Sequence, residues 1–201
     1  MELMTKSIVK CYPNLSHVLD IGCGAGNYDV KLLQNISPLD ITLSDLSMPM
    51  LLKARERVVS LNTGGVTNIV KGDFMELDIS EGQFDVIIAT AVLHHLRSDQ
   101  DWELAFDRFY KWLKPAGSIW IFDLVQQVNQ GLQALIYKEK YGLYLTSLRD
   151  EKYRDEVFSY IEKEDSPRPL LYQLELLKKT GFREVDVLHK NLCFASFVAF
   201  K

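Results

Sequence analysis

Short apolar runs and longer stretches with helical spacing alternate along most of the chain. The apolar runs predict strands at residues 17–22, 40–44, 66–71, 84–90 and 118–123. Between these runs, apolar residues recur at helical spacing at 27–36, 47–60 and 98–113. Strands that alternate with helices predict a mostly parallel sheet with helices on both faces. The run at 84–90 is the most apolar, which predicts a central strand.

The last third of the chain has a different pattern. Residues 124–165 are rich in Tyr, Glu, Lys and Arg and contain no run that predicts a strand. We interpret them as inserted helices that cover the top of the sheet. An amphipathic helix ended by Gly181 follows, and alternating residues then predict two strands, 182–189 and 192–200, around a turn at Lys190-Asn191.

The segment Val18–Gly26 carries the clearest chemical signal. Apolar residues flank Asp20, and three glycines then alternate with small residues. Glycine is needed where the backbone adopts unusual dihedral angles or contacts a ligand directly. A dinucleotide-binding turn reads Gly-x-Gly-x-x-Gly, and here Asn27 stands where its third glycine is expected. A carboxylate just before the turn suits a ligand with a positive amino group better than a pyrophosphate.

A strand, Asp-x-Gly-x-Gly-x-Gly and then a helix resembles the first motif of class I S-adenosylmethionine-dependent methyltransferases. The resemblance extends from residue 17 over nearly the whole chain. It implies an α/β fold with a doubly wound, mostly parallel, Rossmann-like sheet of seven strands, the last of them antiparallel. It also implies one methyltransferase domain over residues 1–201, in which 124–165 form a helical substrate-covering insertion before the last helix and hairpin.

The resemblance further implies S-adenosylmethionine as cofactor and S-adenosylhomocysteine as product. Asp20 would lie near the amino group, Asp45 would accept from the ribose hydroxyls, and Asp73 would accept from the adenine amino group. Taken alone, Asp45 could equally be a helix cap and Asp73 a turn residue. The cofactor-binding residues implied are Asp20, Gly22, Cys23, Gly24, Gly26, Asp45, Leu46, Met50, Asp73, Phe74, Thr90 and Ala91.

Three residues are candidates for catalysis. His94 and His95 follow the fourth strand and either could act as a base, while Asp123 ends the fifth strand on the same side of the sheet. Structural roles remain open for all three, including a helix-capping role for Asp123. We expect no metal site, because adjacent histidines on a strand or a helix diverge.

The insertion is expected to select the substrate. Tyr137, Tyr141 and Tyr144 fall on one helical stripe, and Arg149 lies nearby, so the four could form an aromatic pocket with a cation for an anionic group. The alternative is that the stripe packs on the sheet. The acidic residues of 151–165 are expected to form a solvated face.

Composition narrows the function further. The net charge of −4 argues against a nucleic-acid partner. The fourth strand is not followed by the Asp/Asn-Pro-Pro-Tyr/Phe motif of amino-directed nucleic-acid methyltransferases. Three cysteines without metal spacing, no signal-peptide pattern and no apolar run of membrane-spanning length predict a cytoplasmic protein without membrane association.

These observations favour a methyltransferase that acts on a small-molecule acceptor. Residues 191–201 resemble the last strand of carboxy-S-adenosylmethionine synthases and their relatives in transfer-RNA wobble-uridine modification, which is one alternative function. A non-catalytic cofactor-binding or interaction protein is another. About sixteen residues, with at most a short helix at 1–11, precede the first strand, where many family members have a longer lid. The pocket could therefore be more open, the natural chain longer, or the covering left entirely to 124–165.

Overall fold

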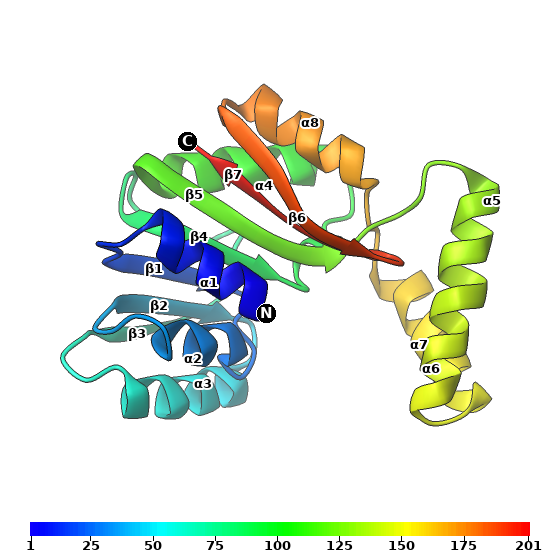
Figure 1. Ribbon diagram of the computed structural model, residues 1–201, viewed down its shortest axis with the longest axis horizontal. Coiled ribbons are helices and arrows are strands. Elements are labelled where there is room, and N and C mark those ends of the chain that lie inside the picture. The colour runs from blue at the N-terminus through cyan, green and yellow to red at the C-terminus, as the bar shows by residue number, and fades with distance from the viewer.

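Seven strands form one sheet in the computed structural model, which describes residues 1–201 (Figure 1). The strand order is β3-β2-β1-β4-β5-β7-β6, with β7 antiparallel to both of its neighbours. The strands are β1 (His17–Ile21), β2 (Asp40–Asp45), β3 (Thr67–Lys71), β4 (Phe84–Thr90), β5 (Leu113–Leu124), β6 (Glu184–Asn191) and β7 (Phe194–Phe200). The predicted fold class, with β4 in the middle of the sheet, is confirmed.

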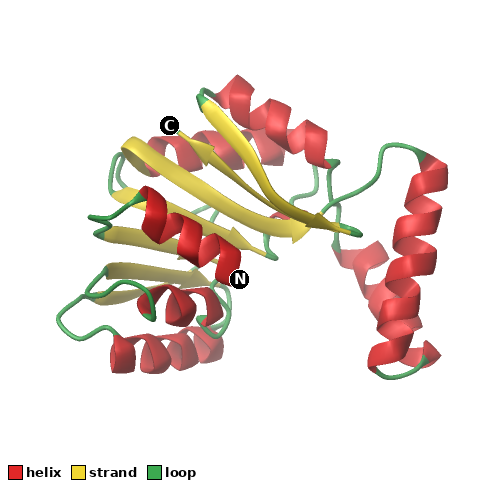
Figure 2. Cartoon of the chain, viewed as in Figure 1, coloured by secondary structure: helices red, strands yellow, loops and turns green.

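Helices cover both faces of this sheet (Figure 2). They are α1 (Glu2–Cys11), α2 (Asn27–Leu33), α3 (Met48–Leu61), the 3-10 turn η1 (Leu93–His95), α4 (Asp99–Trp112), α5 (Gln130–Gln133), the π-helix η2 (Ala134–Tyr141), α6 (Gly142–Leu148), α7 (Glu151–Glu164) and α8 (Leu170–Thr180). Gly181 ends α8 as predicted, with φ of +122°. No helix is both long and apolar enough to cross a membrane.

The alternation of side chains along each strand divides the core into two layers. Leu19 and Ile21 of β1 face α4 and α8 and pack with Trp102 and Phe109. Val18, one residue earlier, faces the opposite layer beneath α1, α2 and α3. Successive side chains of a strand point to opposite faces, so a strand buried on both sides must be apolar throughout.

Two boundaries differ from the prediction. No turn separates α4 from β5, because the strand begins at Leu113 and its pairing with β4 shifts register, with Ala116 at φ of +62° inside the strand. The β6–β7 turn lies at Leu192 and Cys193 rather than at Lys190-Asn191. Cys193 is thereby fully buried, and its carbonyl accepts from the Val125 N–H at 2.7 Å.

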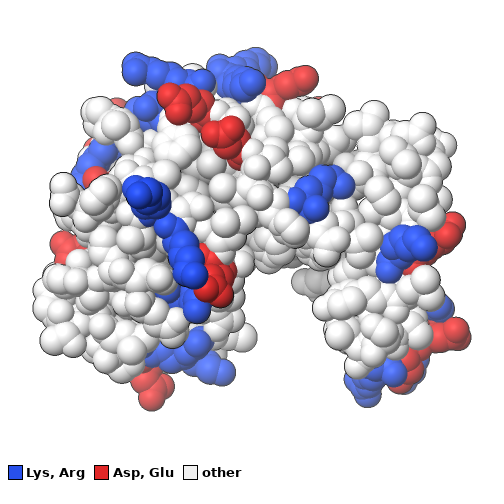
Figure 3. Space-filling model, viewed as in Figure 1, with Lys and Arg blue, Asp and Glu red and all other residues white.

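The insertion is helical, as predicted, and stands at the carboxyl side of the sheet (Figure 1). Figure 3 shows an open notch between its helices and the body of the molecule. A third apolar cluster joins the insertion to the end of the β6–β7 hairpin, with Tyr137, Tyr141 and Leu145 packed against Leu124 and Cys193. The insertion is therefore held at its base.

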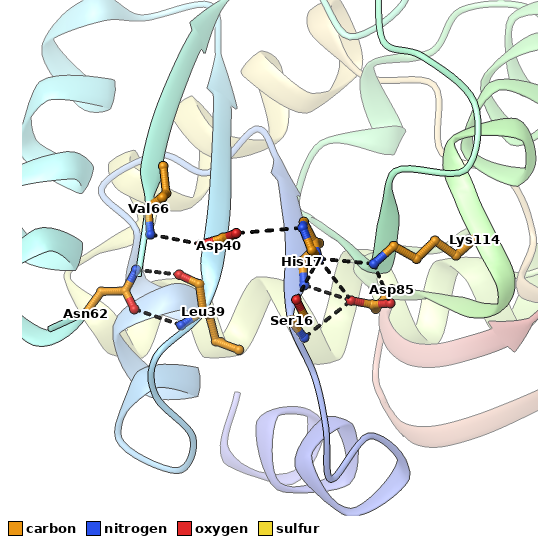
Figure 4. A network of polar contacts seen from close by, with 8 residues as sticks. All are labelled: Ser16, His17, Leu39, Asp40, Asn62, Val66, Asp85 and Lys114. Carbon is orange, nitrogen blue, oxygen red and sulfur yellow. Dashed lines mark hydrogen bonds and ion pairs between the residues drawn. The ribbon is translucent and has the colours of Figure 1, made fainter. Parts of the chain in front are cut away.

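A network of hydrogen bonds and ion pairs lies at the opposite, amino-terminal edge of the sheet (Figure 4). The Asp85 carboxylate accepts from the backbone N–H of Ser16 and His17 and from Lys114 Nζ at 2.9 Å, which joins β1, β4 and β5. The Asn62 side chain forms two hydrogen bonds with the backbone of Leu39. The strands are thus tied together at the edge remote from the glycine turn.

Two aspartates are buried side by side beneath the glycine turn. Asp20 of β1 is 1% exposed and Asp29 of α2 is fully buried. Neither oxygen of Asp29, nor Asp20 Oδ1, has a hydrogen-bond donor. Burial, with the charge of Asp29, raises the pKa of Asp20 well above its usual range, and burial raises the pKa of Asp29 to about 6. A proton held by the pair supplies the missing donor.

This pair should make stability depend on pH. The unfolded aspartate ionises near pH 3.8, whereas folded Asp29 keeps its proton to about pH 6. The folded state therefore binds more protons in this window, and the free energy of unfolding should fall as pH rises from about 4 through about 6. In Asp29→Asn, urea unfolding at a series of pH values should show a smaller fall. Asp186→Asn, on the exposed face of β6, should retain the wild-type fall, and an equal change in both variants would contradict the assignment.

Tyr141 should be needed for the order of the insertion. Its ring is 8% exposed and packs edge-on against Phe194 of β7, with centroids 5.4 Å apart. Tyr141→Ala should cost about 3–5 kcal/mol, the usual loss for a buried aromatic side chain. Hydrogen exchange should show faster exchange of amides in 130–165. Tyr144→Ala, at a half-exposed position, should change little, and equal effects of the two substitutions would mean that the cluster does not hold the insertion.

Candidate functional site

A cavity of about 680 Å³ lies at the carboxyl ends of the strands, next to the start of α4. Ligands of open parallel sheets bind at this edge, and the volume suits a small molecule. Six of the predicted cofactor-binding residues line the cavity: Gly22, Asp45, Leu46, Asp73, Phe74 and Ala91. His95 also lines it, together with Ser44, Gly72, Met75, Glu76, Val92, Leu96, Arg97, Asp101 and Leu104.

The glycine turn follows β1 and has a left-handed backbone at each glycine, with φ of +64° at Gly22, +53° at Gly24 and +70° at Gly26. A Cβ on Gly22 would lie 2.8 Å from Val92 Cγ2, whereas a Cβ on Gly24 would meet no atom within 4 Å. Only glycine adopts such angles routinely. The turn therefore exposes main-chain atoms beside open space, as a backbone that contacts a ligand requires.

Asp45 and Arg57 hold this turn in place. The Asp45 carboxylate ends β2 and accepts from the Gly24 N–H at 2.9 Å and from the Ser47 N–H at 2.8 Å. The Arg57 guanidinium, from α3, donates to the Ala25 carbonyl and to Asn27 Oδ1. Ser47 precedes α3, but its hydroxyl makes no capping bond. Asp45 thus shapes the turn and still has carboxylate lone pairs free to accept from a ligand.

Asp73 and Phe74 form the wall beyond β3. Asp73 Oδ1 accepts from the Met75 N–H at 2.9 Å. Asp73 is therefore a turn residue, which was one of its two predicted roles. The same side chain also lines the cavity. Phe74 packs at a tilt against Phe109 of α4, with ring centroids 5.8 Å apart, which fixes the ring at the cavity wall.

The other six predicted cofactor-binding residues do not line the cavity. Asp20 lies below the turn beside Asp29, and Cys23 is buried, with its pKa raised by burial. Gly26 packs against Ala54 of α3, and Met50 is half-exposed on the same helix. The remaining two are Gly24, which lies within the glycine turn, and Thr90, which ends β4.

Asp123 connects the end of β5 to the loop after β4. Its carboxylate is fully buried and accepts from the N–H groups of Val92, Leu93 and Leu124 and from His94 Nδ1. It does not cap the next helix, α5, which Asn129 caps. Burial opposes protonation of the His94 ring, but the hydrogen bond and charge of Asp123, with the charge of Asp165, raise the pKa of His94 above its usual value.

The two histidines lie closer together than the sequence suggested. They occupy the 3-10 turn η1, and their ring centroids are 4.2 Å apart, so the expectation that the rings diverge is wrong. Asp165, which follows α7, contacts both rings. Its side chain is only 3% exposed, so its assignment to a solvated face is also wrong.

The predicted substrate residues lie away from this cavity. Tyr137 and Tyr141 are buried in the third apolar cluster, and burial raises the pKa of Tyr141 to about 12. Tyr144 is half-exposed, and the Arg149 side chain is 72% exposed beside Asp150. Tyr137 instead lines a second hollow of about 380 Å³, together with Lys138, Asp165 and Arg168.

Sequence reasoning missed Arg57, Asp29 and Asp165. Arg57 and Asp29 lie in helices that the sequence predicted from the spacing of apolar residues alone. Asp165 ends an acidic helix, where a solvated position is the ordinary expectation. Each acquires its role through a contact with a segment distant in the sequence, and no local pattern marks such a contact.

Comparisons with known proteins agree with this geometry. Residues 18–117 match the family described as "Methyltransferase domain". Phosphoethanolamine N-methyltransferase 3 of Arabidopsis thaliana is 29% identical over 177 residues, which cover 87% of this chain and 34% of that protein. The chain therefore spans about one third of the length of this relative. A carboxy-S-adenosyl-L-methionine synthase of Campylobacter jejuni is 24% identical over 212 aligned positions, covering 100% of this chain and 83% of the relative.

A solved structure of phosphoethanolamine N-methyltransferase 2 of Haemonchus contortus, in complex with phosphomonomethylethanolamine and S-adenosylhomocysteine, superposes with a TM-score of 0.62. It is 22% identical, and the match covers 91% of this chain and 38% of that one. A structure this distant in sequence supports the fold, and the fold agrees with the strand order and glycine turn described above. The chain belongs to the class I S-adenosylmethionine-dependent methyltransferases.

Proposed function

We propose that this protein transfers a methyl group from S-adenosylmethionine to a small-molecule acceptor. The observation that carries the proposal is the cavity at the carboxyl ends of β1, β2 and β4, where the Asp45 carboxylate holds the exposed backbone of the glycine turn. A nicotinamide cofactor is disfavoured, since Asn27 replaces the third glycine of the dinucleotide-binding turn.

The residues present fit S-adenosylmethionine. Asp45 faces the cavity with lone pairs available to ribose hydroxyls, and Asp73 and Phe74 offer an acceptor and an aromatic face to adenine. Beneath the turn, Asp20 and Asp29 hold a proton between them, and an ammonium group bound nearby would favour the ionised form of Asp20. The partly used Asp45 carboxylate and the position of Asp73 and Phe74 on the cavity wall support the roles that the family resemblance implies.

When bound, the sulfonium supplies a methyl group that is already activated. The chain then needs mainly to position an acceptor atom, and such positioning contributes roughly 7–11 kcal/mol in favourable cases. His95 lines the cavity, and Asp123 fixes the orientation of the His94 ring beside it. We assign these residues to the acceptor side of the cavity.

A small-molecule acceptor is supported by what the relatives are named for. The Arabidopsis relative is named for phosphoethanolamine, and the Haemonchus structure holds phosphomonomethylethanolamine. The net charge of −4 also argues against a nucleic-acid substrate. We propose that the insertion, residues 124–165, limits access to the acceptor side, since it stands at the carboxyl edge of the sheet (Figure 1).

Carboxy-S-adenosylmethionine synthesis is the second candidate function. Its support is the alignment with the Campylobacter synthase, which includes the C-terminal hairpin and covers the whole chain. Arg97 lines the cavity and is a possible partner for an added carboxylate. Mass spectrometry of the nucleoside that copurifies with the protein separates the two functions, because the two cofactors differ in mass by one carboxylate.

Isothermal titration calorimetry with S-adenosylhomocysteine and with NAD tests the cofactor assignment. We expect micromolar binding of the first and none of the second. An acceptor screen with labelled S-adenosylmethionine then tests transfer. Binding without transfer to any amine, hydroxyl or carbon acceptor would favour the non-catalytic alternative, and absence of binding would contradict the proposal.

Asp45→Ala should weaken the binding of S-adenosylhomocysteine. The substitution removes the ribose acceptor and also releases the Gly24 N–H. Loss of a buried charge-assisted hydrogen bond costs about 1–3 kcal/mol, or roughly 5-fold to 150-fold in Kd. Asp45→Asn, which keeps one acceptor oxygen, should lie between the wild type and Asp45→Ala. Unchanged affinity in a folded Asp45→Ala protein would remove the ribose assignment.

A further inference from the structure

The loop after β4 and the end of α7 bring three metal-ligating side chains together. His94, His95 and Asp165 each offer a ligand atom, and these atoms lie within 4.8 Å of one another. The short turn η1 makes this possible, since it directs two consecutive rings toward the same carboxylate. Two imidazoles and one carboxylate are a common ligand set for catalytic zinc and non-haem iron.

Asp165 is the unusual member of the group. Its side chain is 3% exposed, and its Oδ1 has no hydrogen-bond partner although it lies 3.0 Å from His95 Nδ1. Its Oδ2 lies 3.7 Å from His94 Nε2, which is too far for a hydrogen bond. A buried carboxylate that is left unsatisfied between two imidazoles requires a further partner.

Asp123 fixes the orientation and the tautomer of the His94 ring. His94 Nδ1 faces the buried Asp123 carboxylate, so this nitrogen carries the proton of a neutral ring, and the lone pair of Nε2 points to the side of Asp165. Histidines that bind metals typically donate their other N–H to a carboxylate or a carbonyl, which fixes tautomer and orientation. The Ser166 N–H also donates to the His94 carbonyl at 2.7 Å, which holds Asp165 against the loop.

We propose that His94 Nε2, His95 Nδ1 and the Asp165 carboxylate bind a divalent transition-metal ion. Ligand atoms at about 2.0–2.2 Å around a tetrahedral ion lie about 3.4 Å apart. In the structure, His95 Nδ1 lies 3.0 Å from Asp165 Oδ1, His94 Nε2 lies 3.7 Å from Asp165 Oδ2, and the ligand atoms of all three side chains lie within 4.8 Å of one another, so the side chains would draw together around the ion. Three protein ligands leave at least one coordination position open.

Charge and access agree with this assignment. The carboxylates of Asp123 and Asp165 lie in a poorly solvated region, where a bound divalent ion would offset their charge. The His95 side chain is 45% exposed and lines the main cavity, while Asp165 lines the second hollow. The ion would therefore lie between the two hollows and could be reached from the main one.

Such an ion would serve two purposes. It would join the insertion to the loop after β4 and so fix the base of the insertion. Its open position would take an acceptor oxygen or nitrogen and favour the deprotonated form of a bound hydroxyl. This second role rests on the proposed methyl transfer, whereas binding of the ion does not.

The test is metal binding by the untagged, chelator-treated protein in a Cys11→Ser background, since Cys11 is the exposed thiol. Zn²⁺ is titrated by calorimetry near neutral pH, and Co²⁺ by its visible absorption. We expect one ion per chain, with affinity reduced at least about tenfold in Asp165→Asn and in His95→Ala. Asp123→Asn should also weaken binding, because it removes the orientation of His94.

His17→Gln is the matched control. His17 also lies between two carboxylates, 3.7 Å from Asp40 and 3.6 Å from Asp85, but at the opposite edge of the sheet (Figure 4). Its substitution should leave metal affinity unchanged. Absence of Zn²⁺ binding by the folded wild type, equal binding by Asp165→Asn and His95→Ala, or an equal loss in His17→Gln would each overturn the proposal.

Asp45→Ala separates this proposal from the proposed function. It should lose affinity for S-adenosylhomocysteine and still bind one Zn²⁺. Asp165→Asn should show the reverse pattern, with weakened Zn²⁺ binding and retained binding of S-adenosylhomocysteine. A protein that binds the nucleoside but no metal would contradict the metal site alone, and one that binds the metal but no nucleoside would contradict the cofactor assignment alone.

Discussion

The Asp123 carboxylate is the contact on which the loop after β4 depends. It is fully buried, yet three backbone N–H groups and the His94 ring donate to it. A buried carboxylate without such donors would be strongly unfavourable, and hydrogen bonds to a charged group contribute about 1.5–3 kcal/mol each. Three of these four donors come from the loop after β4, so the end of β5 fixes the conformation of that loop together with the direction of His94.

The polar residues at the two edges of the sheet differ in how their hydrogen bonds are satisfied. At the amino-terminal edge, Asp85 and Asn62 are satisfied by partners within the protein, and they tie the strands together (Figure 4). At the carboxyl edge, Asp165 Oδ1 has no donor. Native proteins rarely leave buried polar atoms unpaired. The unpaired Asp165 oxygen is therefore an atom that a bound ligand would satisfy.

The sequence predicted the features that depend on residues close together in the chain, such as strands and turns. The apolar runs predicted five strands and the alternating C-terminal residues two more, while the glycine turn predicted the methyltransferase family, because the spacing of Gly22, Gly24 and Gly26 is a backbone property of the turn itself. Half of the predicted cofactor-binding residues line the cavity. The rest could not be placed, since the burial of Asp20 beneath the turn and the exposure of Met50 on α3 follow from packing. Contacts across the fold decide these positions.

Asp165 lies where the insertion joins the rest of the protein. Residues 125–129 and 165–169 form its two connections to the sheet, and they meet in a bridge between Gln126 and Pro169. Asp165 lies at the start of the second connection, where it faces His94 and His95. A contact at this base sets the direction of every helix beyond it, whereas a contact at the far end would order only that end. The cluster of His94, His95 and Asp165 therefore lies at the point from which the insertion leaves the body of the protein.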